Sequence, residues 1–199
     1  MKFVLASKNA KKLTEMQTIL SALGVEVCLE SEVGVDVDVE ETGTTFAENA
    51  MLKARAVCEA SGLPAIADDS GLCVNALAGG PGVYSARYGG EGLTDADRYQ
   101  LVLNALKGQI DRGAKFVSVV TACFPNGDVL VARGECPGTI AYAPQGENGF
   151  GYDPVFFVPS LRKTFAQMTA EEKNSISHRG KALEKFKVEL EGYLRGLNQ

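Results

Sequence analysis

Short apolar runs alternate along this chain with segments of helical periodicity, and this order constrains the fold more than any other feature. Phe3–Ala6 has the length of a buried strand, and apolar residues then recur at helical spacing over 13–23, up to Gly24. The runs at 65–67 and 155–158 are equally short. We therefore expect an α/β fold, a mixed β-sheet flanked by helices.

Three segments carry a capping-box sequence, in which a threonine precedes an acidic residue by three positions. The pairs are Thr45 and Glu48, Thr94 and Asp97, and Thr169 and Glu172. Since the two side chains of such a box satisfy main-chain N–H groups at a helix start, a helix is expected after each threonine. The first should end at Gly62 and the second near Gly108. A last helix is expected to place on one face the residues Leu183, Phe186, Leu190 and Leu194.

Other strands are predicted from alternation and turn residues. Val33–Glu40 alternates valine with mostly acidic residues, which predicts a half-exposed strand with an acidic face. The β-rich segments 115–124 and 129–133 flank the turn Pro125–Asp128, which predicts a hairpin. The run at 65–67 stops at two aspartates, where a strand is expected to meet a turn over 68–71.

Composition narrows the class of protein. The chain has 199 residues, 45% hydrophobic, and we expect one domain over 1–199. Its net charge of −5 argues against a nucleic-acid partner. Its five cysteines form no C-x-x-C pair and are expected to be reduced thiols. No apolar run is long enough for a signal peptide or a bilayer span, so we expect a cytoplasmic protein with no membrane partner.

The segment Ser7–Lys12 lies between the first expected strand and helix. Main-chain N–H groups at a helix start favour an anion, and three lysines add positive charge. An ordinary helix cap at Ser7 or Asn9 with solvated lysines is the alternative. The phosphate-binding pattern G-x-x-x-x-G-K-[ST] is absent.

An acidic group forms the second candidate site. It combines Glu40 and Glu41 with Asp68 and Asp69. Carboxylate oxygens suit Mg²⁺, which often takes one or two protein carboxylates together with substrate phosphates. The alternative is a set of solvated surface carboxylates.

Two further segments could recognise an organic ligand. The stretch 147–154 offers two glycines for close main-chain approach and two aromatic rings for stacking, or else simply leads into a strand with its rings in the core. His178 and Arg179 stand before the last helix, with Lys173 shortly upstream. Because His178 is the sole histidine, metal sites built from several histidines are excluded.

Six motifs in the same order resemble the inosine triphosphate pyrophosphatase family, in its bacterial branch. The resemblance runs from about Phe3 to Leu183, and the segment Gly82–Tyr88 adds to it. The motifs are Ser7-x-Asn9-x-x-Lys12, Glu40-Glu41-Thr42-Gly43, Thr45-Phe46-x-Glu48-Asn49-Ala50, Ala67-Asp68-Asp69-Ser70-Gly71-Leu72, Phe150-Gly151-Tyr152-Asp153-Pro154 and Ser177-His178-Arg179-Gly180.

The resemblance implies an elongated mixed sheet with two lobes, an active-site cleft between them, and a homodimer. It also implies Mg²⁺-dependent hydrolysis of ITP, dITP and XTP to the monophosphate and pyrophosphate. Asp69 would bind Mg²⁺ with Glu40 and would also be the base that activates water. The triphosphate would be held by Ser7, Lys8, Asn9, Ala10, Lys11 and Lys12, with Ser70 and Lys173. The base would be held by Phe150, Gly151, Tyr152, Asp153, His178 and Arg179. Many relatives have Thr-Gly-Asn in place of Ser7-Lys8-Asn9.

Three alternatives stand beside this reading. A Maf-type nucleotide pyrophosphatase would act on modified pyrimidine and other nucleotides. A nucleotide-binding regulator would use the same loops without turnover. An RNA-binding module is suggested by the lysines and scattered aromatic residues, and the isoelectric point of about 5.0 counts against it.

Overall fold

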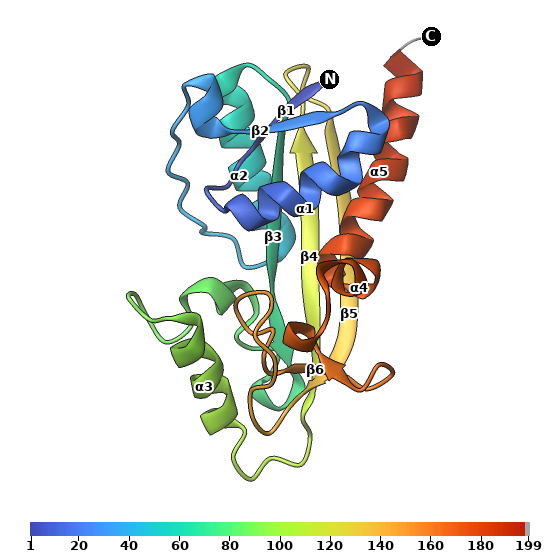
Figure 1. The fold of residues 1–199 in the computed structure, drawn as a ribbon. Coiled ribbons are helices and arrows are strands. Elements are labelled where there is room, and N and C mark those ends of the chain that lie inside the picture. The colour runs from blue at the N-terminus through green and yellow to red at the C-terminus, as the bar shows by residue number, and fades with distance from the viewer. Residues whose placement is uncertain (198–199) are drawn as a thin grey trace. The chain divides into compact units, whose positions relative to one another are not determined.

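A seven-stranded mixed sheet with helices beside it organises the chain (Figure 1). The computed structural model describes residues 1–197, and all their side chains except those of Lys11 and Leu197. The strands are β1 (Lys2–Leu5), β2 (Glu26–Leu29), β3 (Ala65–Val74), β4 (Gly113–Cys123), β5 (Val129–Ile140), β6 (Phe156–Val158) and β7 (Lys163–Thr164). The helices are α1 (Ala10–Leu20), α2 (Phe46–Ser61), α3 (Asp95–Ala105), α4 (Ala170–Ile176) and α5 (His178–Leu197).

The strand order is β2-β1-β3-β4-β5-β6-β7. β1 pairs in parallel with both β2 and β3, whereas β6 pairs antiparallel with β5 and β7. The hairpin predicted around Pro125–Asp128 is confirmed, because β4 and β5 are sheet neighbours joined by residues 124–128 alone. The predicted fold class, a mixed sheet flanked by helices, is confirmed.

All three predicted capping boxes are present. The hydroxyl oxygen of each threonine accepts a hydrogen bond from the N–H of the acidic residue, at 3.1–3.2 Å. Each carboxylate in return accepts the threonine N–H at 2.8–3.0 Å. At the other end of α2, Gly62 is left-handed, with φ of 66°, a conformation that ends helices.

The chain divides into two compact units. Unit 1 comprises 1–69, 118–134 and 179–199, and unit 2 comprises 70–117 and 135–178. Strands β3, β4 and β5 each run from one unit into the other. Along the chain, one boundary falls between Asp69 and Ser70 and another between His178 and Arg179.

Unit 1 buries apolar side chains on both faces of its strands. Successive residues of a strand point to opposite faces. The face that carries Phe3 and Ile66 packs against α1 and α5. The opposite face, with Val4 and Ala67, packs against α2. The helical stripe predicted in α5 is confirmed for Leu183, Phe186 and Leu190, which are fully buried, while Leu194 is partly buried.

Unit 2 has its own core, rich in aromatic rings. Phe116, Phe156 and Phe165 pack together, with ring centroids 4.7–5.7 Å apart. Aliphatic side chains of β3 and α3, such as Leu72 and Val102, complete this core. The core therefore supports the loops that lead into and out of β6.

The strand predicted over Val33–Glu40 is absent. The chain makes a 3₁₀ turn over Glu30–Val33, reverses at Gly34 with φ of 72°, and continues to 43 without helix or strand. Of the alternating valines, Val33 and Val37 are partly buried and pack against the α2 face of the core. The buried Glu30 carboxylate accepts the N–H of Val37 at 3.0 Å, a local bond that competes with strand pairing. β2, which the sequence did not reveal, takes the place beside β1.

The turn predicted over 68–71 is also absent. β3 continues through both aspartates to Val74, and Asp68 and Asp69 are both buried. Charged residues are tolerated inside a buried strand only when partners compensate them. Those partners come from three different helices, and sequence spacing does not show this.

Two predictions from composition can be compared with the structure. All five cysteines are reduced thiols, and all but Cys73 are buried. Among the described residues, no helix is long and apolar enough to cross a membrane.

The cap of α2 yields a stability prediction. Replacing Thr45 with alanine removes the acceptor of the Glu48 N–H, so we expect the free energy of unfolding to fall by about 1 kcal/mol in urea denaturation. Thr42→Ala, at an exposed threonine of the preceding loop, serves as the control and should change it by less than about 0.5 kcal/mol. Equal unfolding midpoints for the two variants would contradict a stabilising cap.

Candidate functional site

The loop after β1 forms the start of α1. The Asn9 side chain accepts the main-chain N–H of Lys12 at 3.4 Å, and Ser7 Oγ accepts the N–H of Asn9 at 3.2 Å. Asn9 therefore caps the helix, as the ordinary-cap alternative supposed. A cap does not exclude anion binding, because other N–H groups of a first helical turn still point out of the helix.

The lysines of this loop diverge. Lys8 is exposed and pairs with Asp36 at 2.8 Å, whereas Lys12 turns inward. The Lys12 ammonium lies 2.8 Å from Oδ2 of Asp68 and donates to the Asp68 carbonyl at 3.1 Å. Burial lowers the pKa of Lys12, and the Asp68 charge opposes this shift. Lys11 lies in α1, with its side chain outside the described part of the structure.

Asp68 is a fully buried carboxylate surrounded by donors. Its Oδ2 accepts Nη2 of Arg179 at 3.0 Å and Nε at 3.3 Å, in addition to Lys12. Its Oδ1 accepts the hydroxyl of Ser118 in β4. Arg179 is itself fixed further, because its Nη1 lies 2.7 Å from the carboxylate of Glu15 in α1.

The charges of this group support one another. Burial alone would raise the pKa of Asp68, but the Arg179 guanidinium and the Lys12 ammonium outweigh burial and hold that pKa well below its usual range. Burial would likewise lower the pKa of Arg179, and Asp68 and Glu15 reverse the shift and raise it. Asp68 is therefore ionised at neutral pH, and Arg179 is held as a cation.

Asp69 points the other way. Because neighbouring residues of a strand face opposite sides, Asp69 lies on the α2 face of the sheet, and its partner is Lys53 of α2. The Lys53 ammonium lies 3.0 Å from Oδ1 of Asp69 and 2.7 Å from Oε1 of Glu41. Burial would lower the pKa of Lys53, but the two carboxylates outweigh it and raise that pKa. Burial raises the pKa of Asp69, against the effect of Lys53.

The carboxylates around Asp69 are of the kind that Mg²⁺ takes together with phosphates and waters. Oδ2 of Asp69 is buried and has no hydrogen-bond partner among the described residues, so one oxygen remains for a cation. Glu40 is exposed on the loop before α2, and its neighbour Glu41 reaches Lys53. Within the described residues, no three histidine, cysteine or carboxylate side chains gather into a metal-binding group. One or two carboxylates suffice for Mg²⁺ when phosphates and waters complete its shell.

In unit 2, Asp153 and Lys173 form a buried ion pair. The Lys173 ammonium lies 2.7 Å from Oδ2 of Asp153, and it stands over the ring of Phe150, 4.8 Å from the centroid. The same Asp153 oxygen accepts the main-chain N–H of Phe150 at 2.9 Å. The Asp153 carboxylate therefore holds both Lys173 and the start of its own loop at Phe150. The N–H of Gly151 is held by Asp95 at 2.7 Å.

The other predicted residues of unit 2 differ in exposure. The His178 ring is buried and stacks on Phe116, with centroids 4.6 Å apart. The Tyr152 ring packs in the core and its hydroxyl donates to the Ser85 carbonyl at 2.7 Å, so the expectation that this ring offers a stacking surface is wrong. Phe150 is only half-buried. Ser70, in β3, is also half-buried.

The predicted site residues thus fall into two sets, one in each unit. Unit 1 holds Ser7, Lys8, Asn9, Ala10, Lys11, Lys12, Glu40, Asp69 and Arg179. Unit 2 holds Ser70, Phe150, Gly151, Tyr152, Asp153, Lys173 and His178. Sequence reasoning missed Lys53 and Glu15 altogether. A signal for Lys53 was available, because the capping box predicts a helix that contains it, shortly after the acidic residues Glu40 and Glu41.

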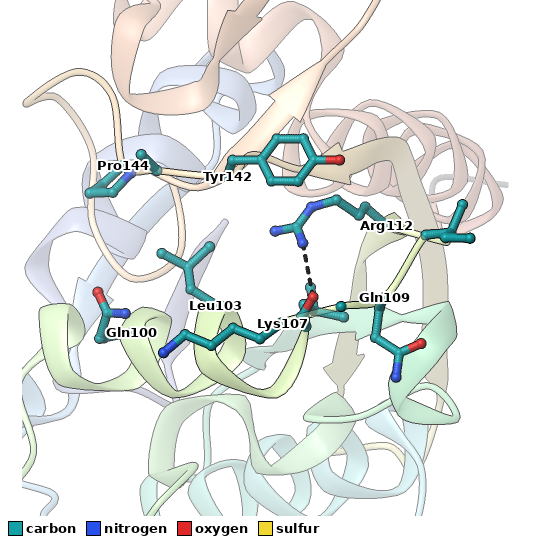
Figure 2. Close-up of a pocket in the computed structure, with 11 residues that line it drawn as sticks. Gln100, Leu103, Lys107, Gln109, Arg112, Tyr142 and Pro144 are labelled. Carbon is teal, nitrogen blue, oxygen red and sulfur yellow. Dashed lines mark hydrogen bonds between the residues drawn. The ribbon is translucent and has the colours of Figure 1, made fainter.

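A pocket on unit 2 contains none of the predicted site residues (Figure 2). Its central cation, Arg112, lies under the Tyr142 ring, 4.3 Å from the centroid. The Arg112 guanidinium donates to the carbonyls of Leu106, Ile140 and Ala141 at 2.7–3.2 Å. We therefore assign Arg112 a structural role, tying the end of α3 to the end of β5.

The chain is similar to known proteins over nearly its whole length. A model of the Ham1 family matches residues 3–189. The dITP/XTP pyrophosphatase of Aromatoleum aromaticum is 52% identical over 184 residues, 92% of either chain. That of Escherichia coli O157:H7 is 52% identical over 186 residues, 92% of this chain and 94% of its own. A solved HAM1 protein from Coxiella burnetii matches with a TM-score of 0.90 at 47% identity, over 96% of this chain and 99% of that one.

The glycines of the 149–151 loop allow a matched stability test. Both Gly149 and Gly151 are left-handed, with φ of 78° and 62°, but only at Gly149 would a Cβ collide with Oδ2 of Asp153, at 2.0 Å. Gly151→Ala should therefore cost about 1–2 kcal/mol of unfolding free energy from its backbone conformation alone. Gly149→Ala should cost clearly more, because it also displaces Asp153 from Lys173. Equal losses in chemical denaturation would show that Asp153 moves aside without penalty.

Proposed function

The chain belongs to the Ham1 family, and from that premise we propose that it hydrolyses non-standard purine nucleoside triphosphates such as dITP, ITP and XTP. The products are the nucleoside monophosphate and pyrophosphate. The observation that carries this proposal is the identity of about half of all residues to enzymes named for dITP and XTP. The Maf-type and regulator readings have no comparable support.

The triphosphate end of the substrate belongs with unit 1. Lys12 and Lys53 both approach the Asp68 carbonyl, at 3.1 and 3.3 Å, so two ammonium groups from different helices converge there. The first turn of α1 adds main-chain N–H groups and the positive end of the helix dipole. We assign Ser7–Lys12 to the phosphates on this ground. The family resemblance adds Ser70 and Lys173.

We propose Mg²⁺ as the cofactor, held by Asp69 and Glu40. Oδ2 of Asp69, which has no partner among the described residues, supports this assignment. Glu40 is exposed, and the next residue, Glu41, pairs with Lys53, which also pairs with Asp69. When bound, Mg²⁺ supplies positive charge that neutralises the phosphate oxygens and lowers the barrier to attack. Lys53 spans Glu41 and Asp69, and it holds the acidic loop beside β3.

Asp69 is also the base proposed for the attacking water. Burial raises its pKa, and a carboxylate with a raised pKa accepts a proton more readily than a solvated one. Lys53 bonds Oδ1 at 3.0 Å and thereby restrains the carboxylate. Water is then the nucleophile, and no covalent intermediate with the protein is needed.

The base of the nucleotide is assigned to Phe150–Asp153, His178 and Arg179. Hypoxanthine and xanthine carry a 6-oxo group where adenine carries an amino group. Donors held in place for that oxygen would be left unpaired by adenine, which disfavours ATP. The restraint of Arg179 by two carboxylates and the stacking of His178 on Phe116 support fixed donors. Tyr152 contributes through its main chain.

We also propose a homodimer that acts in the cytoplasm, where nucleotides are used. Both follow from the family premise.

The reaction is tested by product analysis. The purified protein with Mg²⁺ should convert ITP and XTP to the monophosphate and pyrophosphate, with a preference for ITP over ATP of roughly 10⁴-fold in kcat/KM. EDTA should abolish the reaction. Nucleotide binding without turnover would favour the regulator, and preferential cleavage of dUTP or methylated nucleotides would favour the Maf-type enzyme.

The role of Asp69 has its own test. Asp69→Asn keeps the shape of the side chain but removes the charge and the base, so kcat for ITP should fall by about 10²–10⁴-fold. Asp38→Asn makes the same chemical change at an exposed aspartate of the loop before α2 and should leave kcat unchanged. Turnover near the wild-type rate in Asp69→Asn would exclude this residue as base.

A further inference from the structure

Asp68 is the one buried carboxylate of the acidic group to which the proposed reaction gives no task. It is fully buried, so it does not touch a ligand directly. It nevertheless binds two residues to which the reaction does give tasks, Lys12 on the phosphates and Arg179 on the base. These two residues come from opposite ends of the chain, in α1 and α5.

The geometry of Asp68 leaves each partner little freedom. Lys12 spends two of its three N–H groups on Asp68, one on Oδ2 and one on the carbonyl, and keeps one for a ligand. Arg179 gives Asp68 both Nε and Nη2, which fixes the plane of the guanidinium. Ser118 holds Oδ1 and so keeps Oδ2 turned toward both cations.

We propose that Asp68 is a positioning residue that holds Lys12 and Arg179 in one fixed geometry and thereby couples phosphate binding to base recognition. This inference rests on the proposed function, since it needs Lys12 and Arg179 to serve the two ends of one substrate. A single oxygen shared by both cations is the feature that makes them dependent on each other: a shift of Oδ2 displaces both.

Two substitutions disturb this geometry to different degrees. Asp68→Asn removes the charge, which leaves Lys12 without its carboxylate partner and Arg179 with Glu15 alone, so we expect it to destabilise the fold. Ser118→Ala keeps the charge and removes only the bond that orients the carboxylate. Ser118→Ala therefore keeps the inference testable if Asp68→Asn does not fold. Thr121→Val is the matched control, because Thr121 is a buried residue of the same strand whose hydroxyl bonds to no residue in the described part of the chain.

The measurement is a double-mutant cycle on pyrophosphate release, with folding of each variant checked by circular dichroism. We expect Ser118→Ala to lower kcat/KM for ITP by about 10-fold and Asp68→Asn by about 10²-fold, as misplaced binding groups do. Both should also reduce the preference for ITP over ATP, which a general loss of stability would not change. Thr121→Val should match the wild type in both quantities.

The cycle pairs each of these changes with Lys12→Met. If Asp68 acts through Lys12, the losses in kcat/KM should not multiply. In the Lys12→Met background, Ser118→Ala should then lower kcat/KM for ITP by less than about threefold. Wild-type kcat/KM and selectivity in Ser118→Ala, or losses that multiply fully, would overturn the inference while leaving the proposed function intact. A wild-type protein that releases no pyrophosphate from ITP would instead overturn the proposed function, and this inference with it.

Discussion

The alternation of side chains along β3 is the constraint on which the rest of the site depends. Asp68 and Asp69 are adjacent in sequence, and a strand sends adjacent side chains to opposite faces. Asp68 therefore meets α1 and α5, while Asp69 meets α2. Two carboxylates that would repel each other in a turn are thus separated by the sheet. Asp68 pairs with Lys12 and Arg179, and Asp69 pairs with Lys53.

This separation explains why the two carboxylates have opposite electrostatic character. Two cations outweigh burial at Asp68, and its pKa is held well below the usual range. Burial dominates at Asp69, whose direct ionic partner among the described residues is Lys53, and its pKa is raised. A permanently charged carboxylate suits the positioning of cations, and a more basic one suits the removal of a proton. One strand therefore supplies two carboxylates for different tasks.

In unit 2, too, a buried carboxylate fixes a cation. Asp153 is buried, pairs with the Lys173 ammonium and also accepts the N–H of Phe150. Gly149 is required there because any Cβ would strike that carboxylate. In each unit, a buried carboxylate fixes a cation and a loop that the family resemblance assigns to substrate.

The sequence by itself determined the helix starts, the hairpin, the fold class and the motifs that identify the family. These features depend on contacts between residues close in the chain, such as the three capping boxes, or on patterns that every strand shares. Only the tertiary structure decided that 34–43 is irregular and that β3 continues through its aspartates. It also decided that Lys53 and Glu15 join the site. The irregular segment follows from the buried Glu30 carboxylate, which accepts the N–H of Val37. The other two depend on ion pairs between residues far apart in sequence, and the free energy of a buried charge is set by such partners, which local pattern does not encode.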